Sequence, residues 1–202
     1  MDRVNLAIVG CGDISQLNAP GYLNHEKCNV YALCDSNPQK ATMRAKQWGI
    51  NPKIFSDYED VLNDPNIDAI ELLTPTYMHP KQIIDGLNAD KHVSCQKPIA
   101  STLAEVQDIQ KAVETSSSKF RITENFIFYP PLIKAKELLD SGAIGDPSMI
   151  RIRTLRAGAK MPVSNSTIDF SQMNDPHSDS LIWREDPNLH AGGNVYDDGW
   201  HK

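Results

Sequence analysis

The sequence lacks the features that mark membrane, secreted or nucleic-acid-binding proteins. No apolar run approaches the ~20 residues that cross a bilayer. The N-terminus, from Met1 to Leu6, has no long apolar segment of the kind found in signal peptides. Lysines and arginines are scattered, and a net charge of -6 gives no attraction for nucleic acid or anionic lipid. We therefore expect a cytoplasmic protein with neither a membrane nor a nucleic-acid partner.

Cysteine is scarce, and its spacing excludes common metal and redox sites. The four cysteines, Cys11, Cys28, Cys34 and Cys95, include no C-x-x-C pair. Three of them lie in or beside apolar runs, where cysteine acts as a small hydrophobic residue, so we expect free thiols. The chain also has no G-x-S-x-G segment, which argues against a hydrolase with a nucleophile elbow.

Short apolar runs alternate with helical patterns over the first 124 residues. This alternation predicts βαβ units and an α/β, Rossmann-type, doubly wound parallel sheet in a domain spanning residues 1–124. In the first helix, Pro20 and Gly21 are expected to cause an interruption. The expected strands are 4–9, 29–34, 54–55, 68–73, 92–95 and 120–123, and the expected helices are 13–24, 38–48, 58–62, 80–89 and 102–115.

The pattern changes after residue 124. A helix is expected over 132–139 and an antiparallel strand over 148–155, followed by a polar, irregular excursion over 157–187 that should be poorly ordered in this chain. Residues 125–202 are therefore interpreted as the start of an α+β substrate domain. Because that domain is too short to close, we expect the chain to be a fragment of a longer protein that forms a homo-oligomer.

A glycine-rich turn follows the first expected strand. In the segment from Gly10 to Ser15 (GCGDIS), the first glycine permits a tight turn and the second lets the backbone approach a pyrophosphate at the helix N-terminus. Taken alone, this motif could be an ordinary strand-to-helix turn. Asp35 ends the second strand about 20 residues further on, where a carboxylate hydrogen-bonds a ribose diol and repels a 2′-phosphate. Together they predict a dinucleotide site that favours NAD over NADP.

Three later motifs, together with the glycine turn, make the chain resemble the Gfo/Idh/MocA oxidoreductases from residue 4 to residue 202. Thr74-Pro75-Thr76 with His79 is similar to that family's T-P-N-x-x-H loop, and Gln96-Lys97-Pro98 to its E-K-P motif. Trp183-Arg184 and the segment from Gly192 to His201 are similar to its W-R…G-G-x-x-x-D-x-G-x-H signature. The departures are Gln96 in place of Glu and Thr76 in place of Asn.

The resemblance implies hydride transfer between NAD(H) and a secondary alcohol or ketone of a sugar, cyclitol or related polyol. In such a reaction the protein must move one proton and steady one oxygen. We expect His201 to carry the proton, Asp197 to orient it and Lys97 to steady the oxygen, with Asp198 as the rival carboxylate. The expected cofactor-binding residues are Gly10, Cys11, Gly12, Asp13, Ile14, Asp35, Thr74, Pro75, His79, Gln96, Lys97 and Asn125.

Three alternatives share these motifs. The chain could be a non-catalytic NAD-binding module, or the family member could be a lyase or isomerase that uses tightly held NAD. A metal site of Asp197, His201 and His190 is the third alternative, but hydride chemistry with Lys97 requires no metal, so none is expected.

Overall fold

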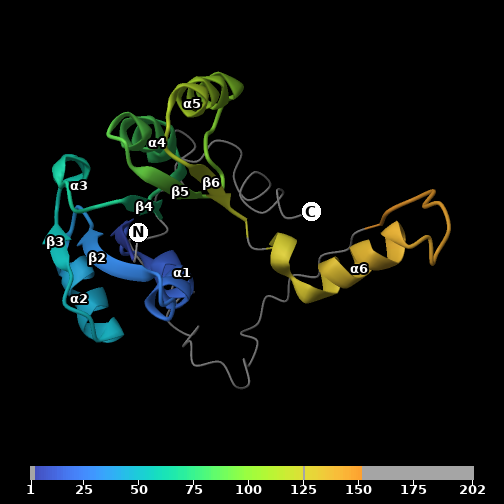
Figure 1. Ribbon diagram of the computed structural model, residues 1–202, viewed down its shortest axis with the longest axis horizontal. Coiled ribbons are helices and arrows are strands. Elements are labelled where there is room, and N and C mark those ends of the chain that lie inside the picture. Colours follow the sequence, from blue (N-terminus) through green and yellow to red (C-terminus); the bar gives the residue numbers. More distant parts are fainter. Residues whose placement is uncertain (1–2, 125, 152–202) are drawn as a thin grey trace, which may run out of the picture.

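A computed structural model describes residues 3–124 and 126–151, and its centre is one parallel sheet (Figure 1). The sheet has six strands in the order β3-β2-β1-β4-β5-β6, and every neighbouring pair is parallel. This order and direction confirm the predicted doubly wound Rossmann-type sheet. The strands are β1 (Val4–Val9), β2 (Cys28–Cys34), β3 (Lys53–Phe55), β4 (Ala69–Leu72), β5 (His92–Gln96) and β6 (Phe120–Thr123).

Helices cover both faces of the sheet (Figure 1). On one face, α1 and α2 pack against a core that includes Ile8 and Leu33; on the other, α3, α4 and α5 pack against a core that includes Ile70 and Val93. Two short 3₁₀ helices, η1 and η2, precede α4 and α6. The bounds are α1 (Asp13–Leu23), α2 (Pro38–Trp48), α3 (Tyr58–Asn63), η1 (Thr76–Met78), α4 (His79–Asn88), α5 (Leu103–Thr115), η2 (Phe126–Phe128) and α6 (Pro130–Asp140).

Local capping explains why the helix boundaries follow the sequence so closely. At α2, the Asn37 side chain accepts from the Gln39 N–H, and Pro38 occupies the first turn, where its missing N–H costs nothing. At α5, Thr102 and Glu105 form a reciprocal capping box. The predicted interruption of α1 at Pro20 is wrong. Pro20 lies in the last turn and removes only its own N–H, so α1 runs on to Leu23.

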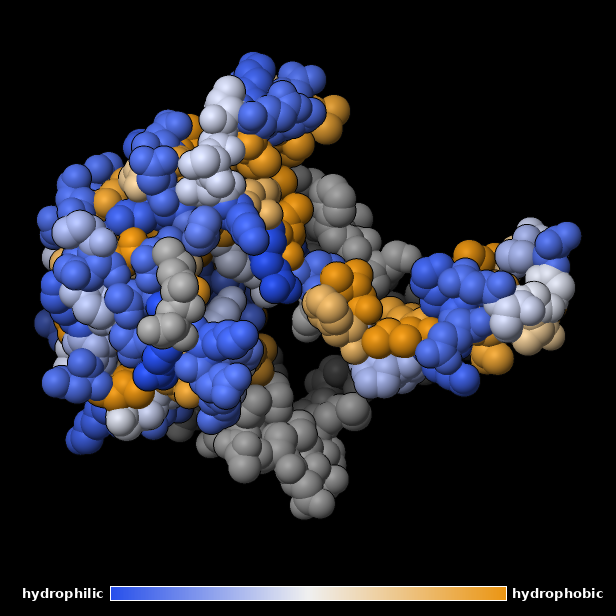
Figure 2. Space-filling view, in the orientation of Figure 1, coloured by the Kyte–Doolittle hydropathy of each residue, from blue (hydrophilic) through white to orange (hydrophobic). Residues whose placement is uncertain are grey.

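The segment after residue 125 extends away from the sheet (Figure 1). The predicted helix is present as α6, and apolar side chains lie along its surface (Figure 2). Leu132 and Ile133 are among its exposed apolar residues. Residues 148–151 of the predicted strand are not in a strand, because no described residue pairs with them, and Met149 is exposed. The rest of that strand and the excursion over 157–187 lie outside the described residues.

None of the helices in the described part of the chain has the length and apolar character of a membrane span.

A polar cluster inside the domain was not predicted from sequence. Glu71, in the central strand β4, is fully buried. Its carboxylate accepts hydrogen bonds from the Tyr22 hydroxyl at 2.6 Å and the Thr123 hydroxyl at 3.1 Å. The Thr123 hydroxyl in turn lies 3.0 Å from that of Ser94, so α1, β4, β5 and β6 share one hydrogen-bond network. Among the described residues, the carboxyl group is satisfied by these two hydroxyls and by no salt bridge.

The Glu71→Gln variant should change how stability depends on pH. Burial raises the pKa of Glu71, so the folded protein keeps this proton at pH values where the unfolded chain, with a pKa near ~4.3, has lost it. The stabilising contribution is therefore complete below the unfolded pKa and is lost as pH rises through the folded pKa. In urea unfolding from about pH 4 to about pH 8, the variant should gain stability relative to wild type as pH rises. A difference that stays constant with pH would contradict this.

Candidate active site

The glycine turn joins β1 to α1, and its two glycines occupy very different surroundings. Gly10 has a φ of +97°, and a Cβ built there would lie 2.7 Å from the backbone carbon and oxygen of Leu73. Gly12 is the N-cap of α1, and a Cβ built there would meet no atom of residues 3–124 or 126–151 within 4 Å. Gly10 is therefore required by the fold, whereas Gly12 faces an open space at a helix N-terminus. That space is where the turn could admit a diphosphate.

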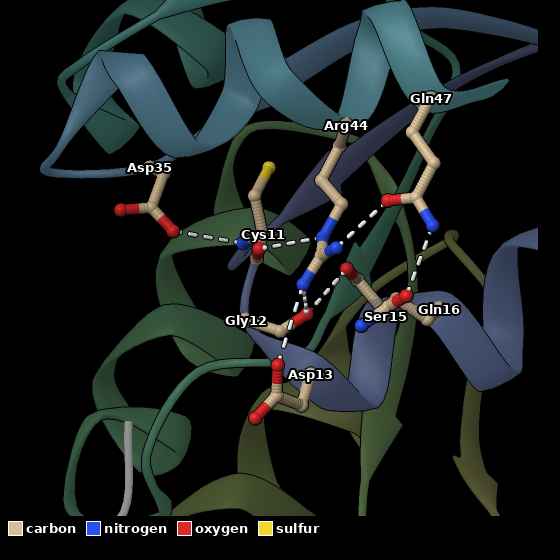
Figure 3. A network of polar contacts seen from close by, with 8 residues as sticks. All are labelled: Cys11, Gly12, Asp13, Ser15, Gln16, Asp35, Arg44 and Gln47. Atoms are coloured by element: carbon tan, nitrogen blue, oxygen red, sulfur yellow. Dashed lines mark hydrogen bonds and ion pairs between the residues drawn. The ribbon is translucent and has the colours of Figure 1, made fainter. Parts of the chain in front are cut away.

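The Asp35 carboxylate is hydrogen-bonded directly to the backbone of this turn. One carboxylate oxygen, Oδ2, accepts from the Cys11 N–H at 2.8 Å (Figure 3). The other, Oδ1, accepts from the Asn37 N–H at 2.9 Å. The sequence pairs these two features as one predicted dinucleotide site, and in the structure a hydrogen bond joins them. Each carboxylate oxygen has two lone pairs, so the group can still accept from a ribose diol.

The Cys11 and Cys34 side chains belong to the core. Cys11 is 1% exposed, and its thiol points toward the carbonyl of Cys34 at 3.7 Å. Burial, followed by the nearby Asp35 charge, raises the pKa of each thiol to about 12. Both thiols therefore stay protonated, and only the backbone of Cys11 is available to a ligand.

The predicted site residues that the structure describes follow the carboxyl ends of adjacent strands. Asp35 follows β2, the glycine turn follows β1, Thr74 follows β4 by two residues, and Lys97 follows β5. Because these strands are neighbours in a parallel sheet, the four groups line one edge. The chain leaves β1 toward β2 on one side and returns to β4 on the other, so this edge contains the topological switch point where open α/β sheets bind ligands.

His79 holds two loops of this edge together. Its ring is 1% exposed, with Nδ1 2.6 Å from the carbonyl oxygen of Pro98 and Nε2 2.7 Å from that of Thr74. Burial lowers the pKa of His79, while the two carbonyls, which can only accept, favour the protonated ring. The ring faces the backbone on both sides. Its predicted part in cofactor binding would therefore be to position two loops, the one after β4 that contains Thr74 and the one after β5 that contains Pro98.

Gln96 and Lys97 lie where β5 ends. The Gln96 side-chain oxygen accepts from the Lys97 N–H at 2.9 Å, which fixes the turn leading to the cis Lys97–Pro98 peptide bond. This places Lys97 at the sheet edge on the side of β4 remote from the glycine turn. Asp35, the candidate for the adenosine ribose, and Lys97, the candidate for the reaction, thus lie three strands apart along one edge of the sheet.

Arg44 is a residue of this site that the sequence reasoning missed. It comes from α2, its side chain is 7% exposed, and it donates hydrogen bonds to the carbonyls of Cys11 and Gly12 (Figure 3). It also forms an ion pair with Asp13 at 3.4 Å. Burial lowers the pKa of Arg44, and the Asp13 charge opposes this. A signal was present, because Arg44 falls on the same helical face as buried Ala41, where a charge needs partners.

Three predicted site residues, Asn125, Asp197 and His201, lie outside the described residues. The same holds for His190 of the alternative metal site and for the rival carboxylate Asp198.

Comparison with known proteins agrees with this geometry. Residues 4–124 match the GFO_IDH_MocA oxidoreductase family, which has an NAD-binding Rossmann fold. The chain is 31% identical over 153 residues to the uncharacterized oxidoreductase YrbE of Bacillus subtilis, and 30% identical over 130 residues to inositol 2-dehydrogenase of Salmonella typhimurium. These matches cover 74% and 63% of the chain.

Among solved structures, the chain is similar to scyllo-inositol dehydrogenase from Lactobacillus casei with bound NAD(H) and scyllo-inositol. The TM-score is 0.67 at 27% sequence identity, and the match covers 71% of this chain and 43% of that one. The two curated relatives are matched over 44% and 38% of their lengths. The chain thus spans less than half the length of each of these proteins.

Proposed function

Because the chain belongs to the Gfo/Idh/MocA oxidoreductase family, whose NAD-binding Rossmann fold matches residues 4–124, we propose that it is the cofactor-binding part of a polyol dehydrogenase. The predicted family and fold class are confirmed, and NAD is the cofactor of the matched fold. We propose that the reaction oxidises a secondary alcohol of a sugar or cyclitol to a ketone, or the reverse. The inositol dehydrogenases among its relatives support this substrate class.

One observation carries the proposal: the hydrogen bond from the glycine turn to the Asp35 carboxylate, beside the switch point of the sheet. A dinucleotide lying along this edge would place its adenosine ribose at Asp35 and its diphosphate before Gly12. Its nicotinamide end would then reach the loops after β4 and β5, near Thr74 and Gln96. Among the described residues, no atom lies within 4 Å of a Cβ built on Gly12, which leaves room at the N-terminus of α1, and a helix N-terminus favours an anionic group.

The chemical roles follow from the same placement. When bound, NAD(H) would supply the hydride chemistry, so the protein would have one proton to move and one oxygen to steady. We assign the steadying of the oxygen to the Lys97 ammonium, because it lies at the nicotinamide end of the edge. The proton is assigned to His201 and the orientation of its ring to Asp197, four residues earlier.

Two measurements test the proposal. Calorimetric titration of the 202-residue chain with NADH should give saturable binding to one site. NADH formation, followed by absorbance with a panel of inositols and sugars, should identify a substrate of the complete protein. Absence of NADH binding would refute the proposal. Conversion of a substrate without net NADH formation would replace a dehydrogenase with a lyase or isomerase.

Asp35→Asn should weaken NADH binding by roughly 10- to 100-fold, because hydrogen bonds to a charged group contribute about 1.5–3 kcal/mol each. NADPH binding should weaken less or improve, since the carboxylate that repels a 2′-phosphate is gone. Asn keeps one acceptor for the Cys11 N–H, so the glycine turn should stay in place. Fluorescence titration with both cofactors provides the measurement. Equal losses for NADH and NADPH would contradict a contact with the adenosine ribose.

A further inference from the structure

Most of the hydrogen bonds of the Arg44 side chain go to residues outside its own helix, α2. Its Nε donates to the Cys11 carbonyl at 3.2 Å, and one terminal nitrogen donates to the Gly12 carbonyl at 3.3 Å. The other terminal nitrogen donates to the Gln47 side chain at 2.8 Å, which in turn donates to Gln16 at 3.0 Å (Figure 3). A buried guanidinium is costly unless its donors are satisfied. Here two of the acceptors are consecutive carbonyls of the glycine turn.

These two bonds determine which way the turn presents its N–H groups. In a trans peptide the C=O and the following N–H point in opposite directions. With the carbonyls of Cys11 and Gly12 held toward Arg44, the N–H groups of Gly12 and Asp13 point away from it, toward the side where a diphosphate would bind. The Ser15 hydroxyl also donates to the Gly12 carbonyl, at 2.6 Å, and strengthens this orientation.

Arg44 also offsets a charge that would oppose cofactor binding. Asp13 is the first residue of α1, and its carboxylate lies at the helix end that would receive a diphosphate. The two like charges would repel each other within a partly buried site. The Asp13 carboxylate is directed toward the Arg44 guanidinium, and the ion pair offsets its charge (Figure 3).

We propose that Arg44 is a positioning residue for diphosphate binding, which fixes the peptides after Cys11 and Gly12 with their N–H groups outward and neutralises Asp13. The inference rests on the proposed function, since it presumes that the site binds a dinucleotide. It assigns to an α2 side chain a role in a site otherwise built from the β1–α1 turn and Asp35.

The test compares ligands with and without a diphosphate. Arg44→Met should lower the affinity for ADP-ribose and NADH by about 10- to 100-fold and leave the weak binding of adenosine, followed by NMR titration, within about twofold. Arg44→Lys keeps the charge but loses the planar set of donors, so its affinity for ADP-ribose should lie between those of wild type and Arg44→Met. Adding Asp13→Asn to Arg44→Met should recover part of the loss, because the carboxylate whose charge Arg44 no longer offsets is then removed.

Several outcomes would overturn the proposal. These are equal losses for adenosine and ADP-ribose, undiminished ADP-ribose binding in Arg44→Met, or an Asp13→Asn change that recovers nothing. If Arg44→Met proves unfolded by circular dichroism, Arg44→Lys carries the same comparison, and diphosphate binding equal to wild type would refute the inference. A wild-type chain that binds no NADH refutes the proposed function itself, so the two failures are distinguishable.

Discussion

Replacing Lys97 by methionine should lower kcat of the complete enzyme by roughly 10²- to 10³-fold, the usual loss when one donor to a developing oxyanion is removed. Lys97 directly follows β5, at the reaction end of the edge where the other site loops meet. Its ammonium is the cation that we assign to the substrate oxygen, and methionine keeps the length of the side chain without the charge. Steady-state kinetics with an inositol substrate would measure the effect.

Cofactor binding provides the internal control for this variant. The proposed diphosphate and adenosine contacts lie at β1 and β2, two or three strands away from β5, and Lys97 would meet only the nicotinamide end of the cofactor, so NADH affinity should fall far less than kcat. Lys97→Arg keeps the positive charge and should retain more activity than Lys97→Met. If turnover of Lys97→Met equals that of wild type, Lys97 has no part in the chemistry and its position at the sheet edge is incidental.

Much of this fold was accessible from sequence because its signals are local. The apolar runs of β1 and β2, the cap at Asn37 and the capping box at Thr102 each act within a few residues. Over residues 4–124, the apolar runs and helical patterns predict the helices and strands to within a residue or two, and the βαβ connection rule then leaves few ways to order the sheet. The glycine turn and Asp35 were predictable for the same reason, since each sits at a strand end.

The features that escaped prediction depend on contacts between distant segments. Arg44 is 33 residues from the Cys11 carbonyl that it bonds, and Glu71 is 52 residues from Thr123. Nothing near Glu71 in the sequence indicates that two hydroxyls will satisfy a carboxyl group in the central sheet. His79 was recognised from its motif, but only the fold shows that both ring nitrogens face carbonyls and that the ring joins two loops.

The two glycines of the turn should respond to alanine in opposite ways. Gly10→Ala places a Cβ 2.7 Å from the backbone of Leu73 at a φ of +97°. Positive φ and steric crowding each cost about 1–3 kcal/mol, so the free energy of unfolding should fall by roughly 2–6 kcal/mol. Since domains of this size have about 5–15 kcal/mol of stability, this is a large fraction of the total. Urea unfolding followed by circular dichroism measures it.

Gly12→Ala should leave the fold intact and damage binding instead. Its φ of -71° is accessible to alanine, and the added methyl meets no atom of the described part of the chain within 4 Å, so stability should change by less than about 1 kcal/mol. The methyl projects into the space proposed for the diphosphate, where overpacking of about 1–3 kcal/mol corresponds to a loss of NADH affinity of roughly 5- to 100-fold. Gly10→Ala thus tests whether the turn depends on its approach to β4, and Gly12→Ala tests whether the space in front of it is used. A Gly12→Ala chain that is stable and binds NADH as tightly as wild type would place the diphosphate elsewhere.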